Sequence, residues 1–214
     1  MINILCINYN TPDLIGKLIE SYYRFGYDKY RLIIIDGSDK KEYVAQSRKI
    51  QEKHKNVLFD FVGYNIHHGT GLHYAIHKYV SDYHLLVDSD LQFIKEGFVE
   101  YCLSNMKPYG IGRWEKMREG DDILDYMHPN GCLISHKMYI KHKPLIAHGA
   151  PFRNTMADLH TKGIFYDVIG QLSADRTVTD NYYSFVEKGK RGTRERFGMS
   201  KDLFVKLNKK FGVA

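Results

Sequence analysis

The chain has 214 residues, of which 43% are hydrophobic and 26% are charged. This composition is typical of a folded globular protein with one well-filled core, and it excludes a disordered or membrane-embedded chain. The formal net charge is +6, and the segment from Phe185 to Ala214 carries nine Lys or Arg against three Asp or Glu, a surplus equal to the whole net charge. Such a basic end favours an anionic partner: a diphosphate, a nucleic acid or an acidic membrane surface.

The sequence carries no signal for export or membrane insertion. Apolar runs such as Leu32-Ile33-Ile34-Ile35 are far shorter than the ~20 residues that span a bilayer. The amino terminus lacks the basic region and small-residue cleavage site of a secretory signal. Cys6, Cys102 and Cys132 are odd in number and widely spaced, which indicates buried free thiols rather than disulfides or a zinc site. We therefore expect a soluble, cytoplasmic protein.

Strands and helices are expected to alternate through the first half of the chain. Runs rich in Ile, Leu and Val predict strands, and Thr11 followed by Pro12 is typical of a helix start because apolar residues then recur at helical spacing. The expected strands are Ile2–Ile7, Arg31–Ile35, Val57–Val62 and His84–Val87, and the expected helices are Asp13–Phe25, Lys41–His54 and Gly69–Val80. This alternation predicts an α/β fold with right-handed βαβ units and a mostly parallel central sheet flanked by helices.

The second half is less regular. We expect a helix around Gly97–Asn105 and strands near Tyr109–Trp114 and Gly131–Ser135, with Asp121-Asp122 in a solvated loop. Turn chemistry suffices to explain the segment His128-Pro129-Asn130-Gly131. We expect a single domain over residues 1–172, with halves at 1–95 and 96–172, followed by a basic carboxyl-terminal lid or arm over 173–214.

The most informative motif is Asp88-Ser89-Asp90, which directly follows the expected strand His84–Val87. Two carboxylates two residues apart, at the carboxyl end of a parallel strand, lie where open α/β sheets bind ligands. Carboxylate oxygens are hard ligands for divalent cations. The motif therefore predicts a site for a cation held against a diphosphate.

Four motifs fall in the order found in one enzyme family. They are Asn8-Tyr9-Asn10, Ile35-Asp36-Gly37-Ser38, Gly71-Leu72-His73-Tyr74-Ala75 and Asp88-Ser89-Asp90. With them, roughly the first 100 residues resemble the family 2 glycosyltransferases of GT-A fold. A further similarity is Gly189-Lys190-Arg191-Gly192-Thr193, near the carboxyl end.

The resemblance implies a role for several residues. Tyr9 and Thr11 would line the nucleotide pocket, and Asp36 would accept a hydrogen bond from the base. Asp88 would lie near the ribose and the metal, and Asp90 would be the principal ligand of Mn²⁺ or Mg²⁺. The implied donor is a nucleotide-sugar, with UDP as the expected nucleotide. Residues 1–95 would form the nucleotide-sugar-binding half of the domain, and 96–172 the acceptor-side half.

The third metal ligand and the tail are less defined. Many members of the family supply a further His just before the basic glycine-rich stretch, where this chain has none. Glu187, His148 or His160 could substitute, or basic residues such as Lys190 and Arg191 could bind the diphosphate. The interleaved glycines would allow close approach of the backbone to an anion.

Asp158 is the candidate base for inverting transfer, because the resemblance expects an acidic residue before a helix here and an acceptor hydroxyl must lose its proton as it attacks. The alternative is a capping role, since Thr155 and Asp158 have the spacing of a capping box. The sequence leaves both roles open.

Two other functions are consistent with part of the sequence. A nucleotidyltransferase shares the nucleotide-binding sheet and the acidic site, but it should have a basic, glycine-rich loop after the first strand. A nucleic-acid-binding module would use the basic tail. The acceptor of the transferase is open, and because the chain is basic it includes a hydroxylated base of modified DNA.

Overall fold

The computed structural model describes residues 1–145, 150–172 and 177–185, with side chains at 177–179 left out. The strands are β1 (Ile2–Asn8), β2 (Arg31–Asp36), β3 (Leu58–Phe61), β4 (Tyr83–Asp88), β5 (Leu91–Phe93), β6 (Gly110–Glu119), β7 (Asp122–Met127), β8 (Cys132–Ser135), β9 (Ile169–Leu172) and β10 (Tyr183–Phe185). The helices are α1 (Pro12–Arg24), α2 (Lys41–Lys53), α3 (His68–Lys78), α4 (Phe98–Asn105), α5 (His136–Tyr139), α6 (Arg153–Thr161), α7 (Phe165–Val168) and α8 (Thr177–Tyr182).

The first four strands form the parallel part of the sheet. The strand order is β3-β2-β1-β4-β8-β6-β7, with β9 paired to β6, and β1 pairs in parallel with both β2 and β4. These strands are rich in Ile, Leu and Val because both of their faces are covered, as in other parallel sheets. The predicted α/β fold with a mostly parallel sheet flanked by helices is confirmed.

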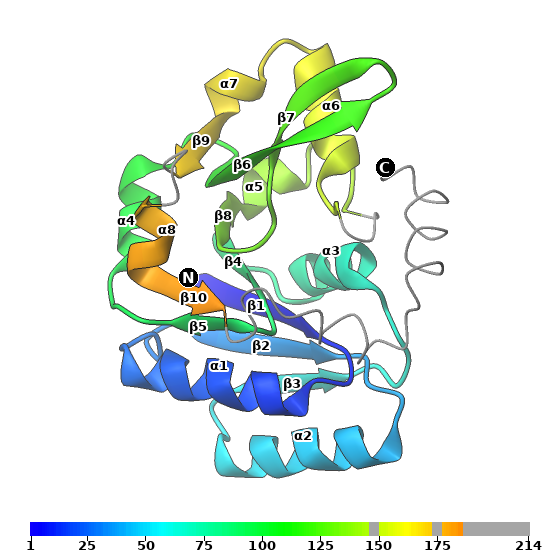
Figure 1. Cartoon of the computed structure of the whole chain (residues 1–214), viewed down its shortest axis with the longest axis vertical. Coiled ribbons are helices and arrows are strands. Elements are labelled where there is room, and N and C mark those ends of the chain that lie inside the picture. The colour runs from blue at the N-terminus through cyan, green and yellow to red at the C-terminus, as the bar shows by residue number, and fades with distance from the viewer. Residues whose placement is uncertain (146–149, 173–176, 186–214) are drawn as a thin grey trace.

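Helices cover both faces of the parallel strands. Figure 1 shows α1 and α2 on one side of β1–β3 and α3 on the other. α1 begins at Pro12. Proline is favourable at this position because the first residue of a helix has no intrahelical acceptor for a backbone N–H, and proline has no N–H. Its residues Leu14, Ile15, Leu18 and Ile19 are buried, at the spacing that places them on one helix face.

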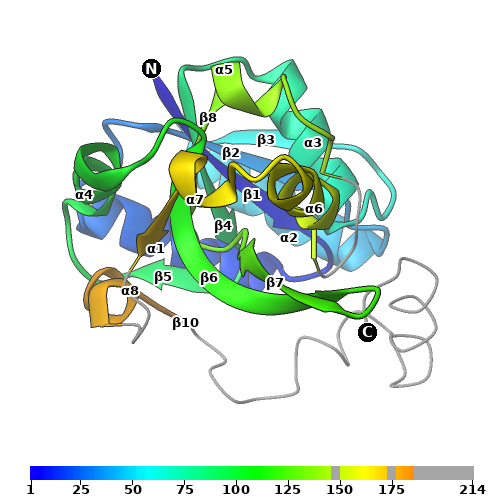
Figure 2. The same cartoon turned by 90° about the horizontal axis from the view of Figure 1, so that it is seen from above.

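The second half extends the sheet with antiparallel strands. β4 pairs antiparallel with β8, and β6 pairs antiparallel with β8 and with β7. The long, curved β6–β7 hairpin passes beside α6 (Figure 2). Asp122, which was expected in a loop, instead begins β7, and only Gly120 and Asp121 separate the two strands of the hairpin.

Part of the expected carboxyl-terminal arm packs against the domain. β10 pairs antiparallel with β5, and Tyr183 is 4% exposed in the same hydrophobic cluster as α1. β5 directly follows the Asp88-Ser89-Asp90 motif, so β10 lies beside the acidic end of β4. None of the helices in the described ranges is long and apolar enough to cross a membrane.

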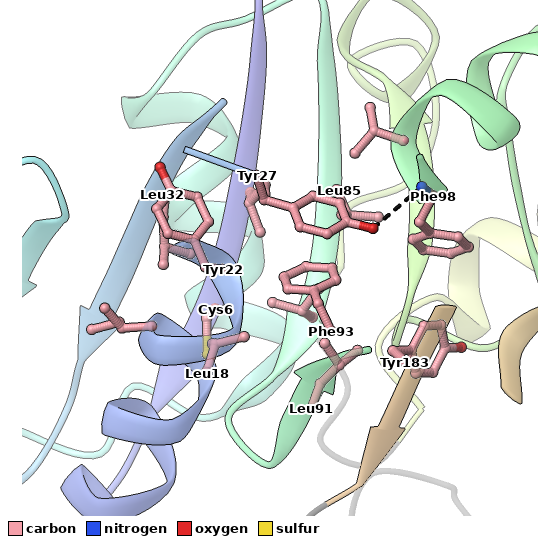
Figure 3. Packing of buried hydrophobic residues seen from close by; sticks show 14 of the residues in the cluster. Cys6, Leu18, Tyr22, Tyr27, Leu32, Leu85, Leu91, Phe93, Phe98 and Tyr183 are labelled. Carbon is pink, nitrogen blue, oxygen red and sulfur yellow. Dashed lines mark hydrogen bonds between the residues drawn. The ribbon is translucent and has the colours of Figure 1, made fainter. Parts of the chain in front are cut away.

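Aromatic side chains fill the cluster between α1, β5 and α4. The rings of Tyr27 and Phe93 are stacked, with centroids 3.9 Å apart, and both are 1% exposed (Figure 3). The Tyr27 hydroxyl accepts a hydrogen bond from Phe98 N–H at 3.2 Å and donates to Lys95 O at 2.7 Å. It thus supplies a partner for a backbone N–H in the first turn of α4.

We expect Tyr27→Phe to lower the free energy of unfolding by about 1–3 kcal/mol, because it leaves a buried N–H and a carbonyl unpaired without changing the ring packing. Chemical denaturation measures the change. Tyr166→Phe is the control, because the Tyr166 side chain is exposed and its hydroxyl donates to Asp125. Its loss of unfolding free energy should be smaller. Equal losses in the two variants would contradict the capping role of Tyr27.

Candidate active site at the carboxyl edge of the parallel strands

Asn8 joins the ends of two strands to the start of α1. The parallel register places Asn8 opposite Asp36, and the Asn8 side-chain amide donates to Asp36 Oδ2 at 2.9 Å. Asn8 Oδ1 accepts a hydrogen bond from the Thr11 hydroxyl at 2.7 Å. All three side chains are buried. The predicted pocket residue Thr11 is therefore at the helix start, where its hydroxyl binds Asn8 and does not cap the helix.

Asp36 orders the turn after β2. Its Oδ1 accepts the N–H of Ser38 at 2.8 Å, and the Ser38 hydroxyl accepts the N–H of Asn10 at 2.9 Å. A Cβ on Gly37 would lie 2.6 Å from the backbone oxygen of Tyr64, so the turn accepts only glycine. Asp36 is 1% exposed and both its oxygens accept bonds from the protein. Its contact with a donor base stays a prediction.

Asp39 also lies at this edge, although its type and position in the sequence led to no expected role. It accepts hydrogen bonds from the Tyr9 hydroxyl at 2.7 Å and from the side-chain amide of Asn10 at 2.9 Å. These two donors hold the pKa of Asp39 below its usual value, so that its exposed carboxylate is ionised at neutral pH. The partly buried Tyr9 thus lies at the rim of the edge, beside an anion. The position of Asp39, three residues after the end of β2 at Asp36, is the sequence feature that could have indicated it.

The acidic motif lies at the end of β4, on the other side of β1. Ile7 of β1 pairs with Asp88, and the Thr11 hydroxyl lies 3.4 Å from that of Ser89. Burial raises the pKa of the Cys6 thiol, and the charges of Asp88, Asp90 and Asp36 raise it further. Three carboxylates therefore gather around the end of β1.

Histidine and arginine side chains surround Asp88. His68 Nε2 lies 3.4 Å from Asp88 Oδ1. Burial lowers the pKa of His68 to about 4, so the ring is neutral at pH 7 and the contact is not an ion pair. Burial raises the pKa of Asp88, while His128 and Arg113 oppose that shift. Their place beside Asp88 could not be predicted from local sequence patterns, because they come from α3, β6 and the loop after β7.

The donor set fits a divalent cation shared with a diphosphate. Within residues 1–145, 150–172 and 177–185, no three His, Cys, Asp or Glu side chains are placed to hold a metal ion together. Asp88 and Asp90 would supply two hard oxygen ligands, and burial raises the pKa of Asp88. Mg²⁺-like cations are commonly bound by one or two carboxylates together with substrate phosphates.

Of the three candidates for the third metal ligand, His160 lies within the described residues, and its described contacts are with groups other than Asp88 and Asp90. His160 Nε2 bonds the backbone oxygen of Asp125 at 2.8 Å, and its ring stacks on Phe165 at 4.2 Å. Four other predicted site residues lie outside the described residues: His148, Glu187, Lys190 and Arg191.

Asp158 lies inside α6 and not before a helix, so the capping interpretation is wrong: α6 begins at Arg153, and Phe152 precedes it as the cap residue. The Asp158 carboxylate binds Lys162 Nζ at 2.7 Å and lies 3.4 Å from His142 Nδ1. The hydrogen bond from Lys162 is the main reason that the pKa of Asp158 is lowered. The role of base stays a prediction.

The family model described as "Glycosyl transferase family 2" matches residues 4–112, which include most of β1, all of β2 to β4 and the acidic motif. No curated protein matches the sequence of the chain.

Several solved structures share the fold at low sequence identity. The mannosyltransferase PcManGT from Pyrobaculum calidifontis, in complex with GDP-Man and Mn²⁺, matches 98% of this chain with a TM-score of 0.59 and 12% identity. Glucosyl-3-phosphoglycerate synthase from Mycobacterium tuberculosis, in complex with Mn²⁺, UDP and phosphoglyceric acid, matches 100% with a TM-score of 0.60 and 13% identity. Residues 1–349 of S. aureus TarS, in complex with UDP-GlcNAc, match 99% with a TM-score of 0.56 and 12% identity. The chain spans 63%, 79% and 65% of these three chains, respectively.

We expect Asp158→Asn to lower turnover by about 100-fold or more at unchanged donor affinity, because a positioned general base contributes at least that much to a proton transfer. Lys162→Met removes the same partly exposed ion pair from the other side and is the matched control; both should cost less than ~1 kcal/mol in chemical denaturation. Turnover of Asp158→Asn within about tenfold of wild type would reject Asp158 as the base, and Lys162→Met should not show the 100-fold loss.

Proposed function

Because this chain belongs to glycosyl transferase family 2, we propose that it transfers a sugar from a nucleotide-sugar donor to an acceptor hydroxyl at the carboxyl edge of β1, β2 and β4. The observation that carries the proposal is the gathering of Asp36, Asp88 and Asp90 around the end of β1. This edge also carries Tyr9 and Asn8, so an aromatic ring, amides and carboxylates converge as a nucleotide site requires.

The nucleoside of the donor would bind on the β1–β2 side. The ring of Tyr9 is partly buried at this rim and its hydroxyl is fixed by Asp39. Thr11 and Asp36 would shape the pocket from beneath, since both bond Asn8. UDP is the proposed nucleotide, because two of the similar structures contain UDP or UDP-GlcNAc; the complex with GDP-Man keeps GDP as the alternative.

The diphosphate would bind on the β4 side. Asp88 and Asp90 would hold a divalent cation, with Mn²⁺ proposed because two of the similar proteins were solved with it. When bound, such a cation neutralises the charge that develops on the departing diphosphate. The protein contributes two carboxylates fixed at a strand end and the neutral ring of His68, which adds no competing charge beside them.

The basic tail is the proposed second partner of the diphosphate. Phe185 is the last described residue, and it pairs with Leu91, the residue after Asp90. The tail is therefore attached to the domain beside the acidic motif. Lys190 and Arg191 follow five and six residues later in the sequence, and we keep them as donor-binding residues.

The acceptor is proposed only as a hydroxyl group, and hydroxylated DNA bases stay among the candidates because of the basic tail. Nucleic-acid binding by this tail would weaken steeply with rising salt, so a salt titration with DNA tests it. A nucleotidyltransferase is not favoured by any described contact.

A thermal-shift panel of nucleotide-sugars, each with and without Mn²⁺, tests the proposed function. A donor at 100 times its dissociation constant should stabilise the fold by about 2.7 kcal/mol. We expect one class of base and sugar to raise the melting temperature, and Mn²⁺ to enlarge the shift. No shift with any nucleotide-sugar would contradict donor binding.

Asp90→Asn is expected to abolish the Mn²⁺-dependent shift and to lower turnover by about 100-fold or more, because it removes a charged ligand while retaining the size of the side chain. Its melting temperature without ligands should stay close to wild type, since Asp90 is only partly buried. Asp122→Asn, at the tip of the β6–β7 hairpin, is the control and should behave as wild type. Full transfer by Asp90→Asn with saturating donor would reject the metal assignment.

A further inference from the structure

The turn between β7 and β8 continues the hydrogen bonding of β4 after its partner strand ends. The β4–β8 ladder stops at the pair Leu86–Cys132. Beyond it, Gly131 N–H donates to Leu86 O at 2.8 Å. The N–H of Asp88 donates to the side-chain oxygen of Asn130 at 3.2 Å. A side chain therefore replaces the missing strand at the residue that carries the acidic motif.

Asn130 is itself held in place by His128. The N–H of Asn130 donates to His128 Nδ1 at 3.2 Å, and the N–H of His128 donates to Arg113 O on β6 at 2.8 Å. Asn130 is 5% exposed, so its side chain has little freedom to turn to water. This chain of three hydrogen bonds runs from β6 to the backbone of Asp88.

The space around the turn is filled. Gly131 has a φ of +69°, and a Cβ there would lie 2.5 Å from the hydroxyl oxygen of Tyr183. Tyr183 belongs to β10, which pairs with the strand that follows Asp90. The turn is thus enclosed between β4, β6 and β10. The backbone near Gly131 therefore has no free space into which it could shift after a substitution at residues 128–130.

The hydrogen bond to His128 also fixes which ring nitrogen carries a proton. A ring nitrogen that accepts a hydrogen bond has no proton, so the proton of the neutral ring is on Nε2. The lone pair of Nδ1 is already used, and Nε2 has none to offer. His128 is therefore unsuited to take a proton from an acceptor, and its described role is to hold Asn130.

We propose that Asn130 and His128 are positioning residues, which fix the backbone of Asp88 so that its carboxylate and that of Asp90 bind a divalent cation together. The inference rests on the proposed function, since it concerns the same cation. Groups that orient metal ligands without touching the metal typically change its affinity by about 10–100-fold. Turn chemistry alone, which the sequence suggested for residues 128–131, would predict no such change.

The first test compares Asn130→Ala with Asn3→Ala. Asn3 is buried on β1 and donates to Tyr79 O at 2.6 Å, but it lies at the opposite end of that strand from Asn8. It is thus a matched loss of a buried amide. Mn²⁺ binding without donor is measured by calorimetry, and hydrogen exchange of the Asp88 amide by NMR without metal.

In Asn130→Ala we expect the dissociation constant for Mn²⁺ to rise about 10–100-fold, and the Asp88 amide to exchange faster than in wild type. Asn3→Ala should leave both close to wild type. If the two variants bind Mn²⁺ equally well, the positioning role of Asn130 is wrong.

The second test uses two replacements of His128 that each keep one half of the ring's chemistry. In His128→Asn the amide oxygen can take the place of Nδ1 and accept the Asn130 N–H. In His128→Gln the amide reaches the region of Nε2 instead. We expect His128→Asn to bind Mn²⁺ within about threefold of wild type and His128→Gln to bind it about tenfold more weakly, if orientation of the ligand is what matters. The reverse order would overturn the proposal, because it would mean that His128 acts through Nε2.

The outcomes separate this inference from the proposed function. If the wild type binds neither Mn²⁺ nor any nucleotide-sugar, both fail. If the wild type binds them and Asn130→Ala binds them equally well, only the positioning role fails. Should Asn130→Ala not fold, the order of the two His128 variants decides.

Discussion

The site depends on the parallel pairing of β1 with β2 on one side and β4 on the other. This pairing sets Asn8 opposite Asp36 and Ile7 opposite Asp88, so the polar residues that end three strands meet at one edge. Apolar side chains on both faces hold the strands in this register, because a shift by one residue would turn every buried side chain to the wrong face. The chemistry of the edge is therefore fixed by the core beneath it.

Carboxylates that lie close together repel one another, and the protein offsets this repulsion with hydrogen-bond donors for only some of them. Asp36 is buried and accepts hydrogen bonds from the Asn8 amide and the Ser38 N–H. Asp88 has no such pair of donors among the described contacts to its carboxylate; burial raises its pKa, and the neutral ring of His68 lies 3.4 Å from it. An anion with few donors of its own is well suited to a cation or to a basic segment, and this difference distinguishes the side proposed for the diphosphate from the side proposed for the nucleoside.

The elements of the first half could be predicted because their local patterns agree with their surroundings. Fully buried strands appear as runs of Ile, Leu and Val, and α1 shows its buried face at helical spacing. The patterns fail in the second half. β7 begins at Asp122 and exposes 63% of Ile123, so its outer end lacks the regular alternation of a half-buried strand. The start expected for α6 was several residues too late, because the spacing of Thr155 and Asp158 is that of a capping box. The packing of Phe152 and Met156 instead places the helix start at Arg153.

The sequence by itself determined the acidic residues of the candidate site, since Asp36 and Asp88 end strands whose own composition marks their ends, and Asp90 follows two residues after Asp88. Only the tertiary structure decided what lies around them. Asn130, 42 residues away in the sequence, accepts a hydrogen bond from the backbone of Asp88, and His68 of α3 lies beside the Asp88 carboxylate. Such contacts depend on which strands become neighbours and in which register. A local pattern of residues contains the propensity of each segment, but not the packing that brings distant segments together.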